Sequence, residues 1–219
     1  MVIHKGGFMA KIISFLNGKG GVGKTTLALN VATSLGHKGY SVIAIDTDPQ
    51  FSLSDFHHEK MPFDVSEAES EKDIYKVKKN YSSYDFIIID GAGSLNNISS
   101  AAVFMSDLVI MPITPSALDF RASGSLVDVI EARNDTQPNK VIARWIINKS
   151  VSGTVMTDIL KQAITGSGIQ AFKTKIAQRQ SYIRSLNNEG ETIYNSKDSL
   201  AKGEIDVFVN EILEVLSYE

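Results

Sequence analysis

The sequence has 219 residues, of which 43% are hydrophobic, so it can bury a substantial core and fits one α/β domain better than two. Its formal net charge of −3 means that a contact with nucleic acid would need a local basic surface. The sequence contains no cysteine, which excludes a disulfide framework and any thiolate-held zinc or iron–sulfur site.

The first eight residues precede the first strand-like run, and we expect 1–8 to be a flexible extension of a single domain over 9–219. The short apolar run that follows leads at once into a glycine-rich loop. We therefore expect no signal peptide, which would need a small-residue cleavage site there. We also expect no membrane-spanning helix, which would need about 20 apolar residues.

Apolar runs of strand length recur along the chain and alternate with helical patterns. The strand-like runs are KIISFL (11–16), SVIAID (41–46), YDFIIID (84–90), DLVIMPI (107–113) and VIARWIIN (141–148). Continuous runs of this kind are typical of parallel strands that are buried on both faces. The alternation predicts an α/β fold with a single doubly wound, mostly parallel sheet that is flanked by helices. Ligands are expected at the carboxyl ends of the strands.

Helical patterns fill the gaps between these strands. They cover 25–39, 116–135, 152–165 and the C-terminal 203–219. Gly39 stands where the first of these helices is expected to stop. The segment 54–80 is charged and poor in large aliphatic residues, so we expect a mobile loop and an exposed helix there.

The stretch NGKGGVGKTT (17–26) has the glycine and lysine spacing of a phosphate-binding loop. Its glycines let the backbone curl around phosphates with amide hydrogens pointing inward, and the N-terminus of the following helix adds a favourable dipole. Lys24 is expected to reach the β- and γ-phosphates, and the Thr25 hydroxyl to complete a Mg²⁺ shell. The predicted nucleotide-binding residues of the loop are Gly20, Gly21, Val22, Gly23, Lys24, Thr25 and Thr26.

Carboxylates stand at the ends of two further predicted strands. Asp90 ends the run FIIID, the usual place for an acid that holds Mg²⁺ through water. In DTDPQ (46–50), Asp46 and Asp48 follow another strand, and Asp48 is expected to orient a water or the metal at the γ-phosphate. A turn or helix-capping role is the other interpretation of Asp90. The predicted metal-binding residues are Thr25, Asp48 and Asp90.

Three motifs together resemble the ParA/MinD family of deviant Walker-type P-loop ATPases. KGGVGKTT matches the phosphate loop of that family, DTDPQ its first switch and FIIIDGAG its metal-binding strand. The later stretches VIMPITPSALDF (109–120) and QRQSYIRSLNNEGETIY (178–194) resemble ParA, so the resemblance covers essentially residues 10–217. It implies the P-loop NTPase fold and a weak, Mg²⁺-dependent hydrolysis of ATP to ADP and phosphate.

Lys19 is the most specific element of this resemblance. In the family, the residue that matches it reaches across an ATP-sandwiched dimer to the phosphates of the partner subunit. A cation supplied in this way would neutralise the facing nucleotides and tie dimerisation to ATP. The resemblance therefore implies an ATP-dependent homodimer in which Lys19 binds nucleotide and acts with Lys24 and Asp48 in catalysis. An ordinary solvated lysine is the other interpretation.

The sequence also departs from the family pattern. DGAGS (90–94) stands where many members have two prolines, so we expect a more flexible second switch. Because the loop begins near residue 17, we expect no preceding DNA-reading domain, and in this respect the sequence resembles the short plasmid-type ParA proteins. INKS (147–150) matches the adenine-side loop of the family, and this match implies that Asn148 contacts the base. A polar turn residue is an equally good interpretation of Asn148.

Two segments bear on macromolecular partners. The polar face of the predicted helix at 203–219 is acidic, and anionic lipid would repel it, so we expect no membrane binding. Between residues 171 and 188, the charged residues are all basic: Lys173, Lys175, Arg179 and Arg184. Such a cluster can be an ordinary solvated face. ParA proteins bind DNA nonspecifically from this region, so the resemblance implies that the four residues contact DNA.

These observations lead us to expect a cytoplasmic, ParA-type partition ATPase that is nucleoid-associated when ATP-bound. A ParB-like centromere-binding protein would stimulate its hydrolysis. Two alternatives stay open: a MinD-like positioning ATPase for a non-DNA cargo, and a P-loop metabolic ligase of the dethiobiotin-synthetase type. Lys19 and the lack of an obvious substrate-binding insertion argue against the ligase.

Overall fold

A computed structural model describes the chain over residues 9–48, 61–116, 123–151, 155–185 and 191–217, and at positions 53, 120 and 153. The described residues form a seven-stranded sheet in the order β3-β2-β4-β1-β5-β6-β7, and each strand pairs in parallel with its neighbours. The strands are β1 (Lys11–Phe15), β2 (Val42–Asp46), β3 (Asp64–Glu67), β4 (Phe86–Asp90), β5 (Leu108–Ile113), β6 (Ile142–Ser150) and β7 (Ala171–Ala177).

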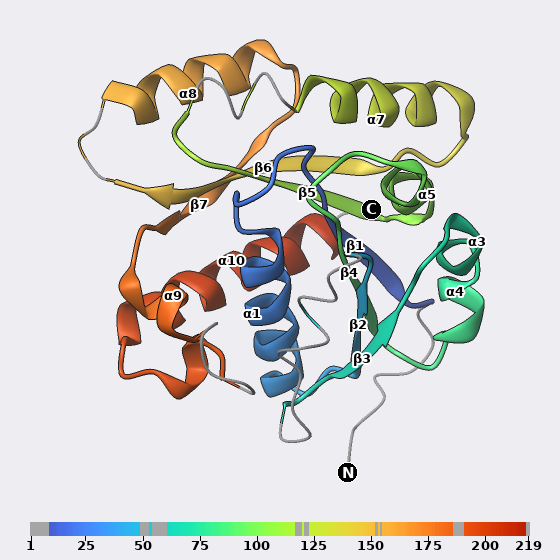
Figure 1. The fold of residues 1–219 in the computed structure, drawn as a ribbon, viewed down its shortest axis with the longest axis horizontal. Coiled ribbons are helices and arrows are strands. Elements are labelled where there is room, and N and C mark those ends of the chain that lie inside the picture. The colour runs from blue at the N-terminus through green and yellow to red at the C-terminus, as the bar shows by residue number, and fades with distance from the viewer. Residues whose placement is uncertain are drawn as a thin grey trace.

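Helices cover both faces of the sheet (Figure 1). One face carries α1 (Lys24–His37), α9 (Gln180–Ser185), the 3₁₀ helix η1 (Ile193–Asn195) and α10 (Ser199–Ser217). The other face carries α3 (Glu71–Ile74), α4 (Val77–Asn80), α5 (Asn97–Met105), α7 (Gly124–Thr136) and α8 (Val155–Gly166). The predicted doubly wound, parallel α/β fold is confirmed.

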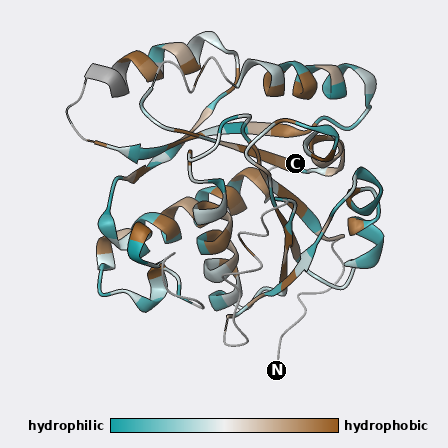
Figure 2. Cartoon of the chain, in the orientation of Figure 1, coloured by the Kyte–Doolittle hydropathy of each residue, from teal (hydrophilic) through white to brown (hydrophobic). Residues whose placement is uncertain are grey.

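The central strands are apolar on both faces because each face packs against a layer of helices. In β4, Ile87 and Ile89 point into the core beneath α5, whereas Ile88 points into the core beneath α1. All three side chains are fully buried, and burial of each contributes roughly 1.5–3 kcal/mol. Figure 2 shows the hydrophobic residues gathered along these central strands and hydrophilic residues on α3 and α4.

The two edge strands of the sheet, β3 and β7, were not predicted from the sequence. The expected loop and helix at 54–80 contains β3, which pairs with β2, and the two short helices α3 and α4. Residues 54–60 lie outside the described residues. The sequence of β3 is DVSE, and it lacks the apolar signal because an edge strand has less surface to bury. The predicted basic segment likewise contains β7.

The pairing of the edge strand β7 with β6 is irregular. Trp145 pairs with Ala171 and Ile147 pairs with Lys175, so two steps along β6 match four along β7. The ladder is therefore interrupted by a bulge. The main-chain N–H groups of Lys173 and Thr174 donate to the Glu211 carboxylate on α10 at 2.6 and 3.0 Å. Glu211 thus satisfies donors at the bulge and ties the edge strand to α10.

The helix boundaries follow the sequence patterns with differences of a few residues at their ends. Helix α1 spans 24–37 and the chain turns at Gly39, whose φ of 87° favours glycine. Helix α7 begins at 124, and part of the predicted segment before it lies outside the described residues, as do residues 1–8. Helix α10 begins at 199, four residues earlier than the predicted C-terminal segment.

No helix within the described ranges is long and apolar enough to cross a membrane.

Candidate nucleotide-binding site

The predicted phosphate loop and both predicted acidic motifs lie at the carboxyl edge of the sheet. Phe15, the last residue of β1, is in register with Asp90 of β4, and Asp90 is in register with Asp46 of β2. The loop leaves β1 directly after this row and enters α1. The parallel sheet thereby brings together three motifs that are far apart in the sequence.

The backbone of the loop has the form that a phosphate cradle requires. Gly21 and Gly23 have φ values of 75° and 97°, in the left-handed region that favours glycine. Helix α1 begins at the next residue, and its N-cap residue, Gly23, has no side chain to cap the first turn. Its first N–H groups therefore remain available to an anion at the positive end of the helix dipole.

Lys24 places a buried cation beside these amides. The residue is 6% exposed, and its ammonium group donates to the Lys19 carbonyl at 3.1 Å across the loop. Burial lowers the pKa of Lys24, and the nearby carboxylates of Asp90 and Asp48 oppose this effect. The lysine therefore lies between the glycine loop and the two predicted metal-binding acids.

Asp90 is a buried carboxylate without a well-formed hydrogen bond, although the Thr25 hydroxyl lies near enough to act on its charge. It is fully buried, and neither of its oxygens has a hydrogen-bond partner among the described residues. Burial raises the pKa of Asp90 to about 7, and the negative charge of Asp46 adds to this, whereas the Thr25 hydroxyl and Lys24 act in the opposite direction. An unpaired buried carboxylate is costly, so the site favours a cation.

These oxygens suit Mg²⁺ bound together with a nucleotide. The described residues contain no cluster of three or more acidic or histidine ligands that could hold a metal by themselves. Mg²⁺ commonly binds through one or two protein groups and completes its shell with waters and phosphates. The carboxylate of Asp90 and the neighbouring Thr25 hydroxyl fit that requirement.

Asp46 has a different environment from Asp90, although the two lie in register. Its carboxylate accepts the main-chain N–H of Asp48 at 3.0 Å and that of Leu53 at 2.9 Å. Asp46 thereby shapes the segment that carries Asp48 and pulls Leu53, which is fully buried, against the sheet. Residues 49–52 lie outside the described residues. Asp46 lies at the ligand edge, as predicted from the sequence, but its bracing role was not predicted.

Asn17 is a second bracing residue that sequence analysis missed. Its Oδ1 accepts the N–H of Lys19 at 2.9 Å, and its Nδ2 donates to the Pro112 carbonyl at 2.8 Å. The start of the loop is thus fixed to the end of β5. Lys19 itself is partly buried. The quoted motif begins with this asparagine, but its contact with residue 112 has no local signal.

Asn148 lies at the far side of the loop, at the end of β6. It is 5% exposed, and its Nδ2 donates to the Val22 carbonyl at 2.8 Å. Its described contact with the loop is therefore to the backbone behind the phosphate cradle. The predicted contact with adenine stays a prediction.

The second switch approaches the loop from the β4 side. The N–H of Gly91 donates to the Phe15 carbonyl at 3.1 Å. A Cβ at Gly91 would come within 2.5 Å of the Leu16 side chain, so this position needs glycine. A Cβ at Gly93 would meet the Cα of Gly20 at 3.7 Å, which places the turn after Asp90 directly beside the glycine loop.

The predicted DNA-binding residues lie on β7, on α9 and on the short turn between them. Lys173, Lys175 and Arg184 are exposed. Arg179 differs, because its guanidinium binds Glu204 at 2.6 Å and lies 4.0 Å from Asp198. The hydrogen bond with Glu204 raises the pKa of Arg179. Its charge is therefore partly neutralised within the fold.

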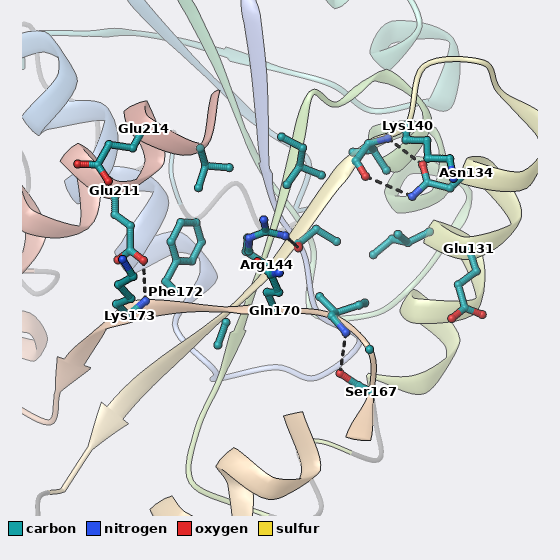
Figure 3. Close-up of a pocket in the computed structure, with 18 residues that line it drawn as sticks. Glu131, Asn134, Lys140, Arg144, Ser167, Gln170, Phe172, Lys173, Glu211 and Glu214 are labelled. Carbon is teal, nitrogen blue, oxygen red and sulfur yellow. Dashed lines mark hydrogen bonds between the residues drawn. The ribbon is translucent and has the colours of Figure 1, made fainter. Parts of the chain in front are cut away.

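A separate cavity of about 800 Å³ lies at the opposite edge of the sheet. Figure 3 shows Arg144 and Gln170 at its centre, with Glu131 of α7 on one side and Glu214 of α10 on the other. It is formed at the amino ends of β6 and β7, whereas the glycine loop lies at the carboxyl edge. The cavity is therefore not part of the nucleotide site.

Comparison with known proteins agrees with this geometry. Residues 13–193 match the CobQ/CobB/MinD/ParA nucleotide binding domain family. The maintenance of carboxysome distribution protein A of Halothiobacillus neapolitanus is 27% identical over 209 residues, covering 92% of this chain and 95% of that protein. Protein ParA of Rhizobium radiobacter is 26% identical over 178 residues, covering 78% of this chain and 80% of that protein.

The structure of an ATP complex of McdA from Cyanothece superposes with a TM-score of 0.79 at 15% identity and covers 94% of this chain and 97% of that one. At this identity the match establishes the fold. The fold and the loop define a P-loop NTPase. The chain belongs to the CobQ/CobB/MinD/ParA family of nucleotide-binding ATPases, and the resemblance to ParA/MinD proteins is confirmed.

Proposed function

We propose that the chain is a ParA-type partition ATPase, in which Mg·ATP drives formation of a homodimer that binds DNA nonspecifically. The observation that carries the nucleotide part is the unpartnered carboxylate of Asp90 beside Lys24, at the mouth of a glycine loop with an uncapped helix start. A negative phosphate chain with Mg²⁺ would satisfy all of these groups together.

Each predicted site residue has a role in this proposal. The backbone amides of Gly20, Gly21, Val22 and Gly23 surround the phosphates, and Lys24, with Thr26 behind it, holds the β- and γ-phosphates at the start of α1. Thr25, Asp48 and Asp90 hold Mg²⁺ directly or through water. When bound, this ion would neutralise phosphate charge during transfer to water. Asp48 orients the attacking water.

Lys19 provides the link between nucleotide and dimer. Its main chain is fixed by Asn17 and by the contact of Lys24 with its carbonyl. We propose that its ammonium group binds the phosphates of the partner subunit. Two facing nucleotides carry several negative charges, so a cation from each subunit would make the dimer depend on ATP.

The DNA part rests on the basic surface of β7 and α9. Lys173, Lys175 and Arg184 are exposed there, while the whole chain is net acidic. Local cations of this kind suit contacts with phosphates that do not depend on base sequence. We expect Arg179 to contribute less than Arg184 because Glu204 already binds its guanidinium. Release from DNA would follow hydrolysis stimulated by a ParB-like protein, and the ATP-bound dimer would be nucleoid-associated.

A positioning ATPase for another cargo is the second candidate function. The similarity to the carboxysome distribution protein over most of both chains favours it. The two candidate functions share the ATP-dependent switch and differ in the cargo to which the partner protein is bound. A metabolic ligase would instead require a small substrate for ATP turnover.

The test is DNA binding with ADP, ATP and a non-hydrolysable ATP analogue at several salt concentrations, with Lys24→Gln as the nucleotide-free control. We expect binding with ATP or the analogue, little with ADP, and none with the variant. Turnover that needs a small substrate and ignores DNA would support the ligase. ATP-dependent dimerisation without DNA binding at low salt would contradict partition of DNA.

A further inference from the structure

Two consecutive side chains at the end of β6 bind two consecutive carbonyls of the glycine loop. Asn148 Nδ2 donates to the Val22 carbonyl, and Lys149 Nζ donates to the Gly21 carbonyl, each at 2.8 Å. The paired residues are separated by 126 and 128 positions in the chain. Since β6 belongs to the rigid sheet, these contacts attach the back of the loop to the scaffold.

These contacts determine where the loop amides point. In a planar trans peptide, the carbonyl and the N–H lie on opposite sides of the chain. Holding the carbonyls of Gly21 and Val22 toward β6 therefore turns the N–H groups of Val22 and Gly23 away from β6. Those two amides belong to the set that a phosphate-binding loop must present to its ligand.

The local backbone of β6 is adapted to this contact. Lys149 has a φ of 51°, which makes it unique among the described non-glycine residues in having a positive φ. Its N–H donates to Oδ1 of Asn148 at 2.9 Å, which holds the asparagine amide with its nitrogen toward the loop. A lysine in this conformation is unfavourable unless its surroundings compensate. The contact with Gly21 provides such compensation.

Gly23 completes the fit from the loop side. A Cβ at this position would lie 2.2 Å from Asn148 Nδ2, so the asparagine occupies the space that a side chain at residue 23 would need. The glycine serves both the left-handed turn, with φ of 97°, and the close approach of Asn148. The loop and the end of β6 are therefore built as one unit.

We propose that Asn148 and Lys149 are positioning residues that preorganise the phosphate loop and set its affinity for a polyphosphate chain, whatever base that chain carries. The proposal rests on the proposed binding of Mg·ATP in this loop. It gives Asn148 a role behind the phosphates. It also gives a role to Lys149, which the sequence motifs did not single out.

The experiment uses the full chain and three probes: Mg·ATP, Mg·GTP and Mg·tripolyphosphate, each competing with a fluorescent ATP analogue. Lys149→Met removes the ammonium donor from an exposed residue and should leave the fold intact. We expect binding of all three probes to weaken by about three- to tenfold, the loss typical of one ordinary hydrogen bond, because this bond is exposed to water. Lys149→Arg should restore wild-type affinity to within about twofold, because its guanidinium also donates.

Further variants separate positioning from other roles. Asn148→Ala should lower the affinity for the three probes by the same factor. A loss of affinity for Mg·ATP alone would mean that Asn148 contacts the base, and it would overturn the proposal. At saturating ATP, kcat of Lys149→Met should equal that of wild type while KM rises, as expected for loss of uniform binding. Lys140→Met, an exposed lysine before the opposite end of β6, is the matched control and should change nothing.

Two outcomes distinguish failure of this proposal from failure of the proposed function. Unchanged affinity of Lys149→Met for all three probes, with normal Mg·ATP binding by the wild type, would overturn the positioning role alone. Absence of Mg·ATP binding by the folded wild-type chain would instead contradict the proposed nucleotide function.

Discussion

Asp46 and Asp90 lie in register at the ends of the neighbouring strands β2 and β4, and both are fully buried. The Asp46 carboxylate accepts two main-chain N–H groups, whereas the Asp90 carboxylate accepts none from the described residues. Asp46 is thus a bracing residue, whereas Asp90 is a candidate metal ligand. Substitution of the two residues should therefore have different effects.

Asp90→Asn should change how stability depends on pH in the nucleotide-free protein. The folded pKa of Asp90 is about 7, above the ordinary value of 3.8, so the folded state holds the proton more tightly than the unfolded state. Stability is therefore lost as pH rises from 3.8 to about 7, and the full loss persists above that range. Asn at this position carries no titrating group, so the free energy of unfolding of the variant should exceed that of wild type by an amount that grows to about 4 kcal/mol across this window.

Denaturant unfolding at pH 5 and pH 8 without nucleotide measures this difference. Asp128→Asn, at an exposed position of α7, is the control, and its free energy of unfolding should stay close to that of wild type at both pH values. Parallel stability curves for wild type and Asp90→Asn would show that burial does not perturb Asp90. The variant should also bind Mg·ATP poorly, because its amide is a weaker ligand for Mg²⁺ than a carboxylate.

Asp46→Ala and Asp48→Ala should differ in which property they damage. Loss of the Asp46 carboxylate leaves the N–H groups of Asp48 and Leu53 without their partner, and should lower the free energy of unfolding by about 2–3 kcal/mol. Asp48→Ala should retain stability, ATP binding and dimerisation but hydrolyse ATP slowly and stay longer on DNA. Hydrolysis at the wild-type rate would make Asp48 a turn residue.

Lys19→Gln should separate nucleotide binding from dimerisation. Lys24 and the loop amides of the same chain remain, so the monomer should bind ATP nearly as well as wild type. The ATP-dependent dimer should disappear because the facing phosphates lose their counter-charge. Light scattering with and without Mg·ATP is the measurement. A variant that dimerises normally with ATP would reduce Lys19 to an accessory of an ordinary loop.

Arg184→Glu and Arg179→Glu form a matched pair on the proposed DNA surface. Arg184 is exposed on α9, so its reversal should weaken DNA binding equally across sequences and reduce the salt slope by about 1, with unchanged thermal stability. Arg179→Glu breaks a partly exposed ion pair with Glu204 and should cost roughly 1 kcal/mol of stability as well. Loss of dimerisation in Arg184→Glu would point to an interface role instead.

The sequence predicts the centre of this molecule better than its edges. Continuous apolar runs such as FIIID identify strands buried on both faces, and the glycine loop has a spacing that few other structures share. Strand β3 reads DVSE and gives no such signal. Asn17 and Asp46 were missed as bracing residues because their partners, Pro112 and Leu53, are set by tertiary packing rather than by any local pattern.

The bulge in β7 has a consequence for solubility. An open strand edge offers unpaired donors and acceptors on which another chain can build a strand. Here Glu211 occupies two of the donors at the bulge, and lysines stand on both sides of Thr174. A kinked, charged edge of this kind is a poor template for edge-to-edge aggregation. Self-association of the chain is therefore expected to use surfaces other than this side of the sheet.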